Sequence, residues 1–370
     1  MFLDDLLLVT VRMQSRFWLG AGSLCRYTNA MTTAIHKKKL LLLFGGESQE
    51  HDVSIVSAQN IYNAINLDRI EPVLCYIDRD GAWWHVAAIA KQPKQIAAVT
   101  PILGAAMVQI GDAKIPIDVI FPVLHGTHGE DGTVQGLAAL MHTPIVGCGV
   151  AGSAVCIDKV LTKQLLAAAD VPIVPFATHH QGEKLPDFAV VSQQLGKVLF
   201  VKPARQGSSV GVSKVSSQAE FVAAVEMALR YDTDVLIESA VASARELEVA
   251  VLGTAEAPRI SGVGEIVPDR DFYTYESKYD NASTSEIVLP AELDPQLAAQ
   301  ARTIAAKAFA VLRCRGLARV DFLLGEDGIL YLNEVNTMPG FTNISMYPRL
   351  WEAEGYSYER LVETLIAGAA

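Results

Sequence analysis

The sequence predicts an α/β protein in which an N-terminal parallel-sheet domain precedes a small central α+β domain and a C-terminal α+β domain. From residue 40, apolar strand-like runs alternate with helical patterns, as in a parallel sheet covered by helices. The next block has more strand character, and the last one joins an alanine-rich helix to two strand-like runs around a GEDG turn. We therefore expect domains at residues 35–153, 154–240 and 241–370.

The elements of the first domain follow from short apolar runs bounded by polar residues. Strands are predicted at residues 40–44, 70–77 and 117–124. A helix is predicted over residues 54–67, and Ser54 is a plausible N-cap because its hydroxyl can accept a hydrogen bond from the first helical turn. The tract 81–114, with several glycines, is predicted to be an insertion before the third strand.

The other two domains mix helices and extended segments. One helix is predicted over residues 154–170 and a second over residues 295–313. A polar loop is predicted over residues 267–284. The extended segments are predicted at residues 171–178, 197–215, 235–239, 246–253 and 318–336.

Composition limits the classes of partner. Of the 370 residues, 51% are hydrophobic and 19% are charged, which is typical of a globular protein. The net charge of -11 disfavours nucleic acid and anionic membrane surfaces. Five widely spaced cysteines without a CxxC pair favour a reducing cytoplasm over a disulfide framework or a zinc cluster. No apolar run approaches the roughly 18 to 20 residues of a membrane-spanning helix.

Residues 1–34 are expected to be a disordered leader or the result of a misassigned start. They lack regular periodicity and include a further methionine, Met31. The first charged residues, Asp4 and Asp5, are acidic where a secretory signal has basic residues, and Arg12 interrupts the apolar run.

The segment 317–341 carries the most informative pattern. Period-two alternation across the predicted hairpin puts Arg319, Asp321, Glu334 and Asn336 on one face. Two carboxylates and an amide are oxygen ligands that suit Mg²⁺, which takes its other ligands from water and nucleotide phosphates. A surface ion pair on a solvated face is the alternative. The tight turn that follows would present backbone N–H groups beside this face, which favours the functional interpretation.

Glycine-containing loops follow several predicted strands. In the segment 201–211, Lys202 stands at the end of an apolar strand and is followed by a loop rich in small and hydroxyl residues, as in phosphate-binding loops, although a surface hairpin loop is an equal alternative. The loops at 45–54 and 124–132 follow buried strands, where ligands of α/β sheets bind. Residues 147–152 match the dinucleotide pattern GxGxxG, but they do not follow the first strand, so this match is weak.

Seven motifs stand along the chain, GGESQEHDVS, LHGTHGEDGTVQG, DKVLTK, VKPARQGSSVG, FYTYESKY, ARVDFLL and NEVNTMPGFT. In their order and approximate spacing, they resemble the D-alanine–D-alanine ligase family of ATP-grasp carboxylate–amine ligases. The resemblance covers residues 38–366 and extends to an insertion like 81–114. It implies an ATP-grasp fold whose N-terminal parallel-sheet domain is Rossmann-like. Ala204 and Gln206 are small departures that remove no group needed by the chemistry.

The resemblance implies an ATP-dependent ligation of two D-alanine molecules through a D-alanyl phosphate, for peptidoglycan synthesis in the cytoplasm. It also implies a homodimer and two Mg²⁺ (or Mn²⁺) ions, for which the matching ligands are Asp321, Glu334 and Asn336. The residues that match nucleotide-binding positions are Lys159, Lys202, Ser208, Glu238, Ser239, Val241, Glu246, Lys278 and Leu323.

The substrate end is implied by the same resemblance. Glu50 matches the acid that holds the first ammonium group, with His125 nearby, and Arg319 and the Gly340 N–H match an oxyanion hole. Positions that bind the second carboxylate match Ser345 and Met346.

The polar loop is expected to be a lid over bound nucleotide. Its residues form little core of their own, and Lys278 can reach a phosphate. Tyr279 matches a group that links this lid to Ser208 and Glu50.

Three other functions compete with this one. A D-alanine–D-lactate or other ATP-grasp ligase is the nearest, although Tyr279 argues against the depsipeptide type. An NAD-type oxidoreductase would need the glycine pattern at 147–152 to be a real dinucleotide site. A catalytically silent nucleotide-binding protein would lack a metal ligand or a phosphate lysine, and none is missing.

A protein that starts at Met31 is expected to fold and to keep full activity, because the preceding residues lack a structural pattern. Soluble yield and turnover of the shortened and full-length proteins measure this. Loss of soluble protein on truncation would show that the leader packs against the body.

Overall fold

A computed structural model describes residues 37–267 and 286–370, which belong to one compact unit, Lys37–Ala370. The predicted leader and residues 268–284 of the predicted lid, including Lys278 and Tyr279, lie outside the described residues, so these predictions stay untested. Val267, the first residue of the predicted lid, is instead the last residue of a strand.

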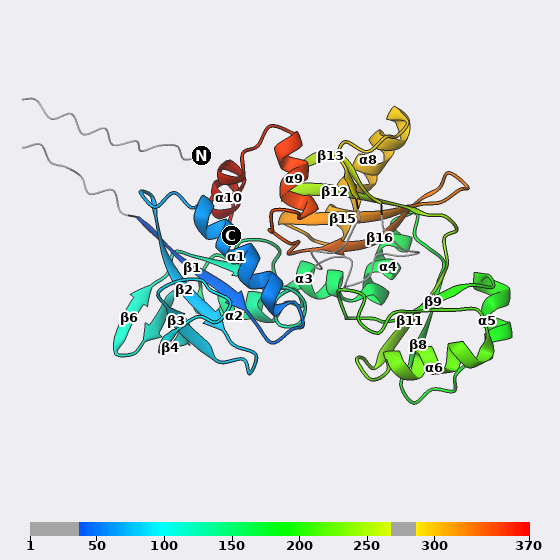
Figure 1. Ribbon diagram of the computed structural model, residues 1–370, viewed down its shortest axis with the longest axis horizontal. Coiled ribbons are helices and arrows are strands. Elements are labelled where there is room, and N and C mark those ends of the chain that lie inside the picture. Colours follow the sequence, from blue (N-terminus) through cyan, green and yellow to red (C-terminus); the bar gives the residue numbers. More distant parts are fainter. Residues whose placement is uncertain (1–36, 268–285) are drawn as a thin grey trace, which may run out of the picture. The chain divides into compact units, whose positions relative to one another are not determined.

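The first sheet has the strand order β6-β5-β4-β3-β2-β1-β7 (Figure 1). β1 pairs in parallel with both β2 and β7, which confirms the predicted parallel sheet. The tract predicted as an insertion forms antiparallel strands that extend this sheet beyond β2. The strands are β1 (Lys38–Gly45), β2 (Ile70–Ile77), β3 (Trp83–Val86), β4 (Gln95–Ile102), β5 (Met107–Ile110), β6 (Ala113–Pro116) and β7 (Val119–Val123).

Two helices cover this sheet, α1 (His51–Ala64) and α2 (Thr133–Met141). The prediction that Ser54 caps the first of them is wrong, because the helix starts three residues earlier and Glu50 is its N-cap. Ser54 is instead fully buried, where its hydroxyl accepts from the Gly45 N–H at 2.8 Å and donates to the Val123 carbonyl. Ser54 therefore ties α1 to the ends of two strands.

The central sheet is antiparallel, in the order β10-β9-β11-β8. The helix predicted over 154–170 is two helices, because the Asp158 carboxylate accepts from the Val160 and Leu161 N–H groups at 3.0 Å and starts a new helix there. The elements are α3 (Val150–Ile157), α4 (Lys159–Ala168), β8 (Phe176–His180), α5 (Phe188–Leu195), β9 (Leu199–Pro203), β10 (Ser213–Val215), α6 (Gln218–Ala228) and β11 (Asp234–Ser239).

The third sheet is antiparallel, in the order β14-β13-β12-β15-β16. One face is apolar and packs against α8, with Leu247, Val320 and Phe322 buried among the alanines of that helix. On the opposite face, Ala250, Leu252 and Leu317 pack against α9 at one end, and polar residues occupy the rest. The elements are β12 (Arg245–Thr254), β13 (Ala257–Val267), β14 (Glu286–Val288), α8 (Pro295–Val311), β15 (Gly316–Leu324), β16 (Leu330–Asn336), α9 (Met346–Ala353) and α10 (Tyr358–Ala367).

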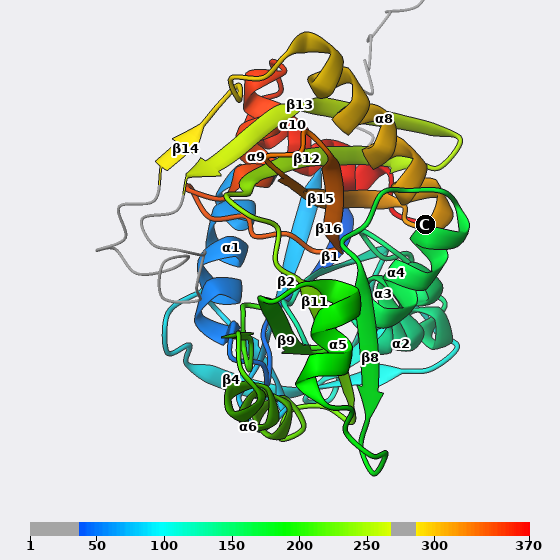
Figure 2. The same cartoon turned by 90° about the vertical axis from the view of Figure 1, so that its right-hand side faces the viewer.

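The hydrophobic cores combine residues that are far apart in the sequence. Residues of β1 and α1 share a core with Tyr347, Trp351 and Leu361 of α9 and α10, and helices α3 and α4 lie beside the third sheet (Figure 2). Cys156 of α3 and Leu166 of α4 are buried in the core beneath that sheet. The predicted boundaries at 153/154 and 240/241 remain a proposal.

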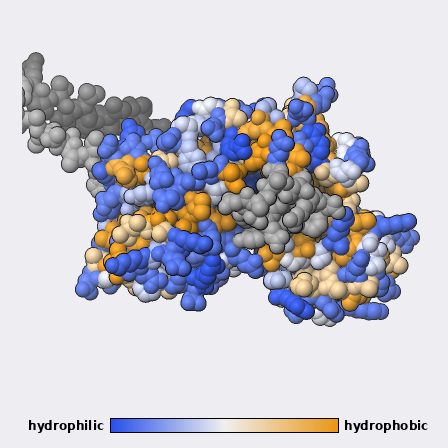
Figure 3. All heavy atoms as spheres, viewed as in Figure 1, coloured by the Kyte–Doolittle hydropathy of each residue, from blue (hydrophilic) through white to orange (hydrophobic). Residues whose placement is uncertain are grey.

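The surface mixes hydrophilic and hydrophobic residues on the face seen in Figure 3. Exposed large apolar side chains occur at several places in the chain, such as Val56 in α1, Leu103 just after β4 and Ile344 before α9. Within the described part of the chain, no helix has the length and hydrophobicity needed to cross a membrane.

The glycines of the GxGxxG match serve packing within the chain. A Cβ on Gly152 would lie 2.7 Å from the carbonyl oxygen of Arg313, and a Cβ on Gly316 would lie 2.8 Å from Cα of Gly147. The segment 313–317 therefore occupies the space beside these glycines where a dinucleotide phosphate would need to approach. This geometry argues against the oxidoreductase alternative.

Substitution of Gly152 by Ala is expected to lower the free energy of unfolding by about 1–3 kcal/mol, because its Cβ would overlap backbone atoms. The matched control is Gly136→Ala in α2, where a Cβ meets no atom within 4 Å and helix propensity should raise stability by about 0.5–1 kcal/mol. Urea denaturation measures both variants. A Gly152→Ala protein as stable as the original would contradict this packing argument.

Candidate active site

The polar face of the third sheet gathers charged residues from three strands. Asp321 of β15 is directly opposite Glu334 of β16, and Arg319 is opposite Asn336. Directly opposite residues point to the same face, which confirms the prediction that these four side chains share a face. Glu246 of β12 is opposite Leu323, so these two predicted nucleotide-binding residues lie on the same face.

Arg319 is held between two carboxylates. Its Nε and Nη2 donate to the two oxygens of Asp321, both at 2.7 Å, and Nε lies 3.0 Å from Oε2 of Glu248. Burial alone would lower the pKa of the Arg319 guanidinium, but Asp321 and Glu248 outweigh it and hold the pKa well above its ordinary value. Arg319 is therefore a permanent, oriented cation on this face.

Glu248 was not among the residues predicted from the sequence. It is opposite Asp321 in the pairing of β12 with β15, and it is 7% exposed. The alternation in the run ELEV could have identified it, because period two places Glu248 on the same face as Glu246.

The donor chemistry of this face fits the predicted divalent cation. Asp321 and Glu334 supply carboxylate oxygens, and the Asn336 amide contacts Asp321 at 2.8 Å through Nδ2. Within the described residues, no group of three or more His, Cys, Asp and Glu side chains is arranged to hold a metal ion. Two carboxylates and an amide are instead the kind of partial ligand set that Mg²⁺ completes with water and phosphates.

Three lysines supply the positive charge near these carboxylates. Lys159 starts α4, and its Nζ donates to the Gln206 carbonyl at 2.7 Å and lies 3.8 Å from Glu334. Burial lowers the pKa of Lys159, and Glu334 opposes that shift. Lys163, one helical turn along α4, and Lys202 of β9 both pair with Glu238 of β11.

Lys163 was also missed by the sequence prediction. Positions i and i+4 of a helix lie on the same face, so the motif DKVLTK places Lys163 next to Lys159. That spacing was visible in the sequence, but the burial of Lys163 was not.

The predicted phosphate loop meets the first domain at Ser208. Its hydroxyl donates to Oε1 of Glu50 at 2.6 Å, across 158 positions of sequence. Ser208 and Ser209 have φ angles of 50° and 60°, a left-handed backbone that costs energy for residues other than glycine. A Cβ on Gly126 would lie 3.4 Å from Oε2 of Glu50, so glycine lets a third loop come close to the same carboxylate.

The turn after β16 is held by hydrogen bonds from the first domain. The Met338 N–H donates to Glu130 Oε1 at 3.1 Å, and His125 Nδ1 donates to the Met338 carbonyl at 2.9 Å. The Phe341 N–H donates to the hydroxyl of Ser57 at 3.1 Å. Gly340, the predicted oxyanion donor, lies between these anchored positions.

Burial shapes the ionisation of the two side chains that hold Met338. It lowers the pKa of His125, which favours a neutral ring with its proton on Nδ1. Burial and the neighbouring Glu50 raise the pKa of Glu130 to about 8. Glu130, which sequence reasoning missed, also accepts from the Gly126 N–H at 2.7 Å.

The remaining predicted residues surround this centre. Ser345 is the N-cap of α9, and its hydroxyl accepts from the Thr342 N–H at 3.0 Å. A Cβ on Gly340 would lie 2.7 Å from this hydroxyl, so the two predicted residues are neighbours. The side chain of Met346 is buried in the core, which leaves its backbone at the helix N-terminus for binding. Ser239 ends β11, and Val241 lies near the turn between β15 and β16.

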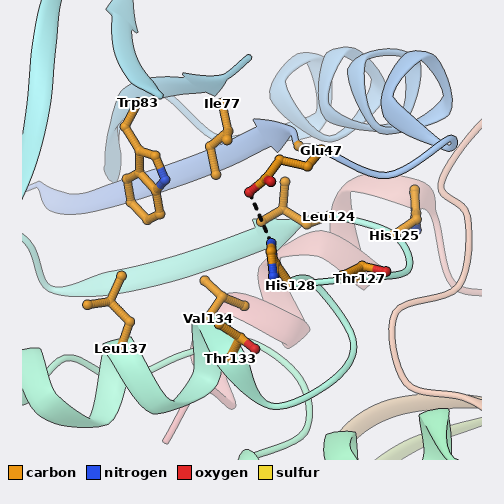
Figure 4. Close-up of a pocket in the computed structure, with 11 residues that line it drawn as sticks. Glu47, Ile77, Trp83, Leu124, His125, Thr127, His128, Thr133, Val134 and Leu137 are labelled. Atoms are coloured by element: carbon orange, nitrogen blue, oxygen red, sulfur yellow. Dashed lines mark hydrogen bonds and ion pairs between the residues drawn. The ribbon is translucent and has the colours of Figure 1, made fainter. Parts of the chain in front are cut away.

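A cavity of about 210 Å³ lies beside the loop that carries His125 (Figure 4). Ile77, Trp83 and Leu137 contribute to its apolar lining, and Glu47 and His128, hydrogen-bonded at 3.0 Å between Oε1 and Nδ1, also line it. The carboxylates of β15 and β16 do not line it, so this cavity is separate from the charged face.

Comparisons with known proteins agree with this geometry. Two family models match, described as D-ala D-ala ligase N-terminus over residues 39–148 and D-ala D-ala ligase C-terminus over residues 165–367. A D-alanine–D-alanine ligase A of Chromobacterium violaceum is 46% identical over 89% of this chain and 94% of its own length. The D-alanine–D-alanine ligase A of Escherichia coli K12 is 43% identical over 90% and 95%.

The chain belongs to the D-alanine–D-alanine ligase family. Solved structures agree: a D-alanine–D-alanine ligase from Coxiella burnetii has a TM-score of 0.78 at 34% identity, over 90% of this chain and 95% of that one. A D-Ala:D-Ser ligase from Enterococcus faecalis has a TM-score of 0.82 at 32% identity, over 90% and 99%. These neighbours confirm the predicted ATP-grasp fold.

In a ligase of this family, Glu334→Gln is expected to lower turnover by about a hundredfold or more if Glu334 is the metal ligand that the sequence predicts, because the charge of that carboxylate is removed without loss of volume. Glu326→Gln, in the exposed turn between β15 and β16, is the matched control and should turn over normally. Steady-state ADP release measures both, and circular dichroism checks the fold. Near-normal ADP release by Glu334→Gln at low Mg²⁺ would remove Glu334 from the ligand set.

Proposed function

We propose that the chain joins two D-alanine molecules to D-alanyl-D-alanine at the expense of ATP, for peptidoglycan synthesis. The carboxylate of the first D-alanine takes the γ-phosphoryl group, and the amine of the second attacks the resulting acyl phosphate. One observation carries this proposal beyond family membership. The carboxylates of β15 and β16 lie on one face with Arg319, and Lys159, which matches a phosphate-binding lysine of the family, lies 3.8 Å from Glu334.

The nucleotide end of the site is assigned to the central and third sheets. Lys159 and Lys202 would bind phosphates as cations, and Asp321, Glu334 and Asn336 would hold two Mg²⁺ (or Mn²⁺) ions. When bound, these ions would neutralise phosphate charge. The adenosine half is assigned to Glu238, Ser239, Val241, Glu246 and Leu323, and the pairing of Glu246 with Leu323 supports this group.

The amino-acid end is assigned to the first domain and the turn after β16. Glu50 binds the ammonium of the first D-alanine, and the hydrogen bond from Ser208 orients the carboxylate for that role. His125 lies close enough to Glu50 for that carboxylate to influence its pKa, and its ring is held by the Met338 carbonyl.

Stabilisation of the negative charge that develops in the ligation step is assigned to Arg319 and the Gly340 N–H. Donors fixed before the reaction stabilise a tetrahedral oxyanion most strongly, and the anchored neighbours of Gly340 support this role. Ser345 and the Met346 N–H bind the carboxylate of the second D-alanine at the N-terminus of α9. Lys278 and Tyr279 remain predicted partners outside the described residues.

A second candidate differs in the second substrate. The D-Ala:D-Ser ligase from Enterococcus faecalis has a fold as similar as that of the D-alanine–D-alanine ligases. D-serine or D-lactate could therefore replace the second D-alanine without a change of architecture, and the difference must be measured.

Assembly and compartment complete the proposal. A homodimer is proposed from the family likeness. A reducing cytoplasm is proposed because Cys75, Cys148, Cys156 and Cys314 are free thiols and ATP is the phosphoryl donor.

ADP release by the purified protein with ATP and Mg²⁺ tests the function. D-alanine alone is expected to support release and to yield D-alanyl-D-alanine, whereas L-alanine is not. Parallel reactions add D-serine or D-lactate, and mass spectrometry identifies the product. Absence of D-alanine-dependent ADP release would remove the proposal, and a mixed product in excess of the dipeptide would favour the second candidate.

A further inference from the structure

The pair of lysines on Glu238 leaves an excess of buried positive charge. Lys163 Nζ lies 2.5 Å from Oε1 of Glu238, and Lys202 pairs with Oε2 of the same carboxylate. The Glu238 side chain is 4% exposed, so two cations share one buried anion. Buried ions are costly unless they are paired, so this excess charge indicates that one lysine has a second, anionic partner in the working protein.

The two lysines differ in how easily they can move away from Glu238. The Lys163 side chain is 1% exposed, lies within the packed face of α4, and has its Nζ 5.8 Å from the centre of the Phe176 ring. The Lys202 side chain is 14% exposed, and Lys202 is the second-last residue of β9, the strand that leads into the loop 204–212. Lys202 is therefore the lysine that can turn to an arriving anion, whereas Lys163 stays with Glu238.

We propose that Lys163 is a positioning residue for nucleotide binding, which balances the charge of Glu238 so that Lys202 can leave it for a phosphate group. The inference rests on the proposed function only in taking a nucleoside triphosphate as the anion. Without Lys163, the departure of Lys202 would strand Glu238 as an unpaired buried carboxylate, so Lys202 would be retained and the phosphates would lose its charge.

The electrostatics of the trio agree with this division. Burial alone would raise the pKa of Glu238, but Lys202 and Lys163 outweigh it and hold the pKa below its ordinary value. Burial lowers the pKa of Lys163, and Glu238 opposes that shift. The charged forms of Glu238 and the lysines therefore stabilise each other, and if one lysine is removed, the other alone must neutralise Glu238.

The test compares a ligand that has phosphates with one that has none. Isothermal titration of the full chain, without D-alanine, uses a non-hydrolysable ATP analogue with Mg²⁺ and, separately, adenosine. Lys163→Met is expected to weaken the affinity for the analogue about tenfold or more and that for adenosine less than about threefold. Lys214→Met, which removes an exposed lysine of β10 in the same lobe, is the control and should bind both as the original does.

A double variant separates positioning from damage to the fold. The Glu238→Gln substitution replaces the carboxylate by a neutral amide, which requires no cation beside it. In this background, the added Lys163→Met substitution is expected to change affinity for the analogue less than about twofold. The double variant removes both buried charges together, so it can be compared with the Glu238→Gln single variant even if Lys163→Met alone folds poorly.

Three results would overturn the inference. They are unchanged affinity of Lys163→Met for the analogue, an equal loss for the analogue and adenosine, and a loss that persists in the Glu238→Gln background. The titration needs no turnover, so it is read independently of whether D-alanine supports ADP release. A wild-type protein that binds the analogue but does not ligate D-alanine would refute the proposed function and leave the role of Lys163 to be judged by these variants.

Discussion

Compensation of buried charge is the constraint on which the polar side of this molecule depends. Arg319 lies between Asp321 and Glu248, and Glu238 lies between Lys163 and Lys202. An ion removed from water without a partner costs several kcal/mol, so each group is tolerated because another is placed against it. In the proposed function, the same pairing keeps Lys202 available for phosphates and Arg319 available for a developing oxyanion.

The fold supplies these partners from separate parts of the chain. The antiparallel pairing of β12, β15 and β16 brings three carboxylates into register, while the apolar residues between them pack on α8. Helix α4 brings its lysines to the central sheet because its opposite side is buried beneath the third sheet. Packing on one side of each element therefore positions chemistry on the other side.

Much of the site could be predicted locally. Two-residue alternation placed Arg319 and Asp321 on one face, and the observed register agrees. Sequence patterns failed where a contact is distant. Ser54 resembles a helix cap, but the fold uses its hydroxyl to join two strand ends. The position of Asp158 inside an apolar helical run concealed a helix boundary that its side chain creates.

The sequence by itself determined the family, the strand and helix types, and which residues alternate on the hairpin, because these depend on neighbours within a few positions. Tertiary structure alone decided that Ser208 meets Glu50 and that Glu130 and His125 hold Met338. It also decided that Lys163 is buried against Glu238. These contacts join residues that are 75 to 213 positions apart or depend on burial, and no local pattern encodes either a long-range distance or exclusion of water.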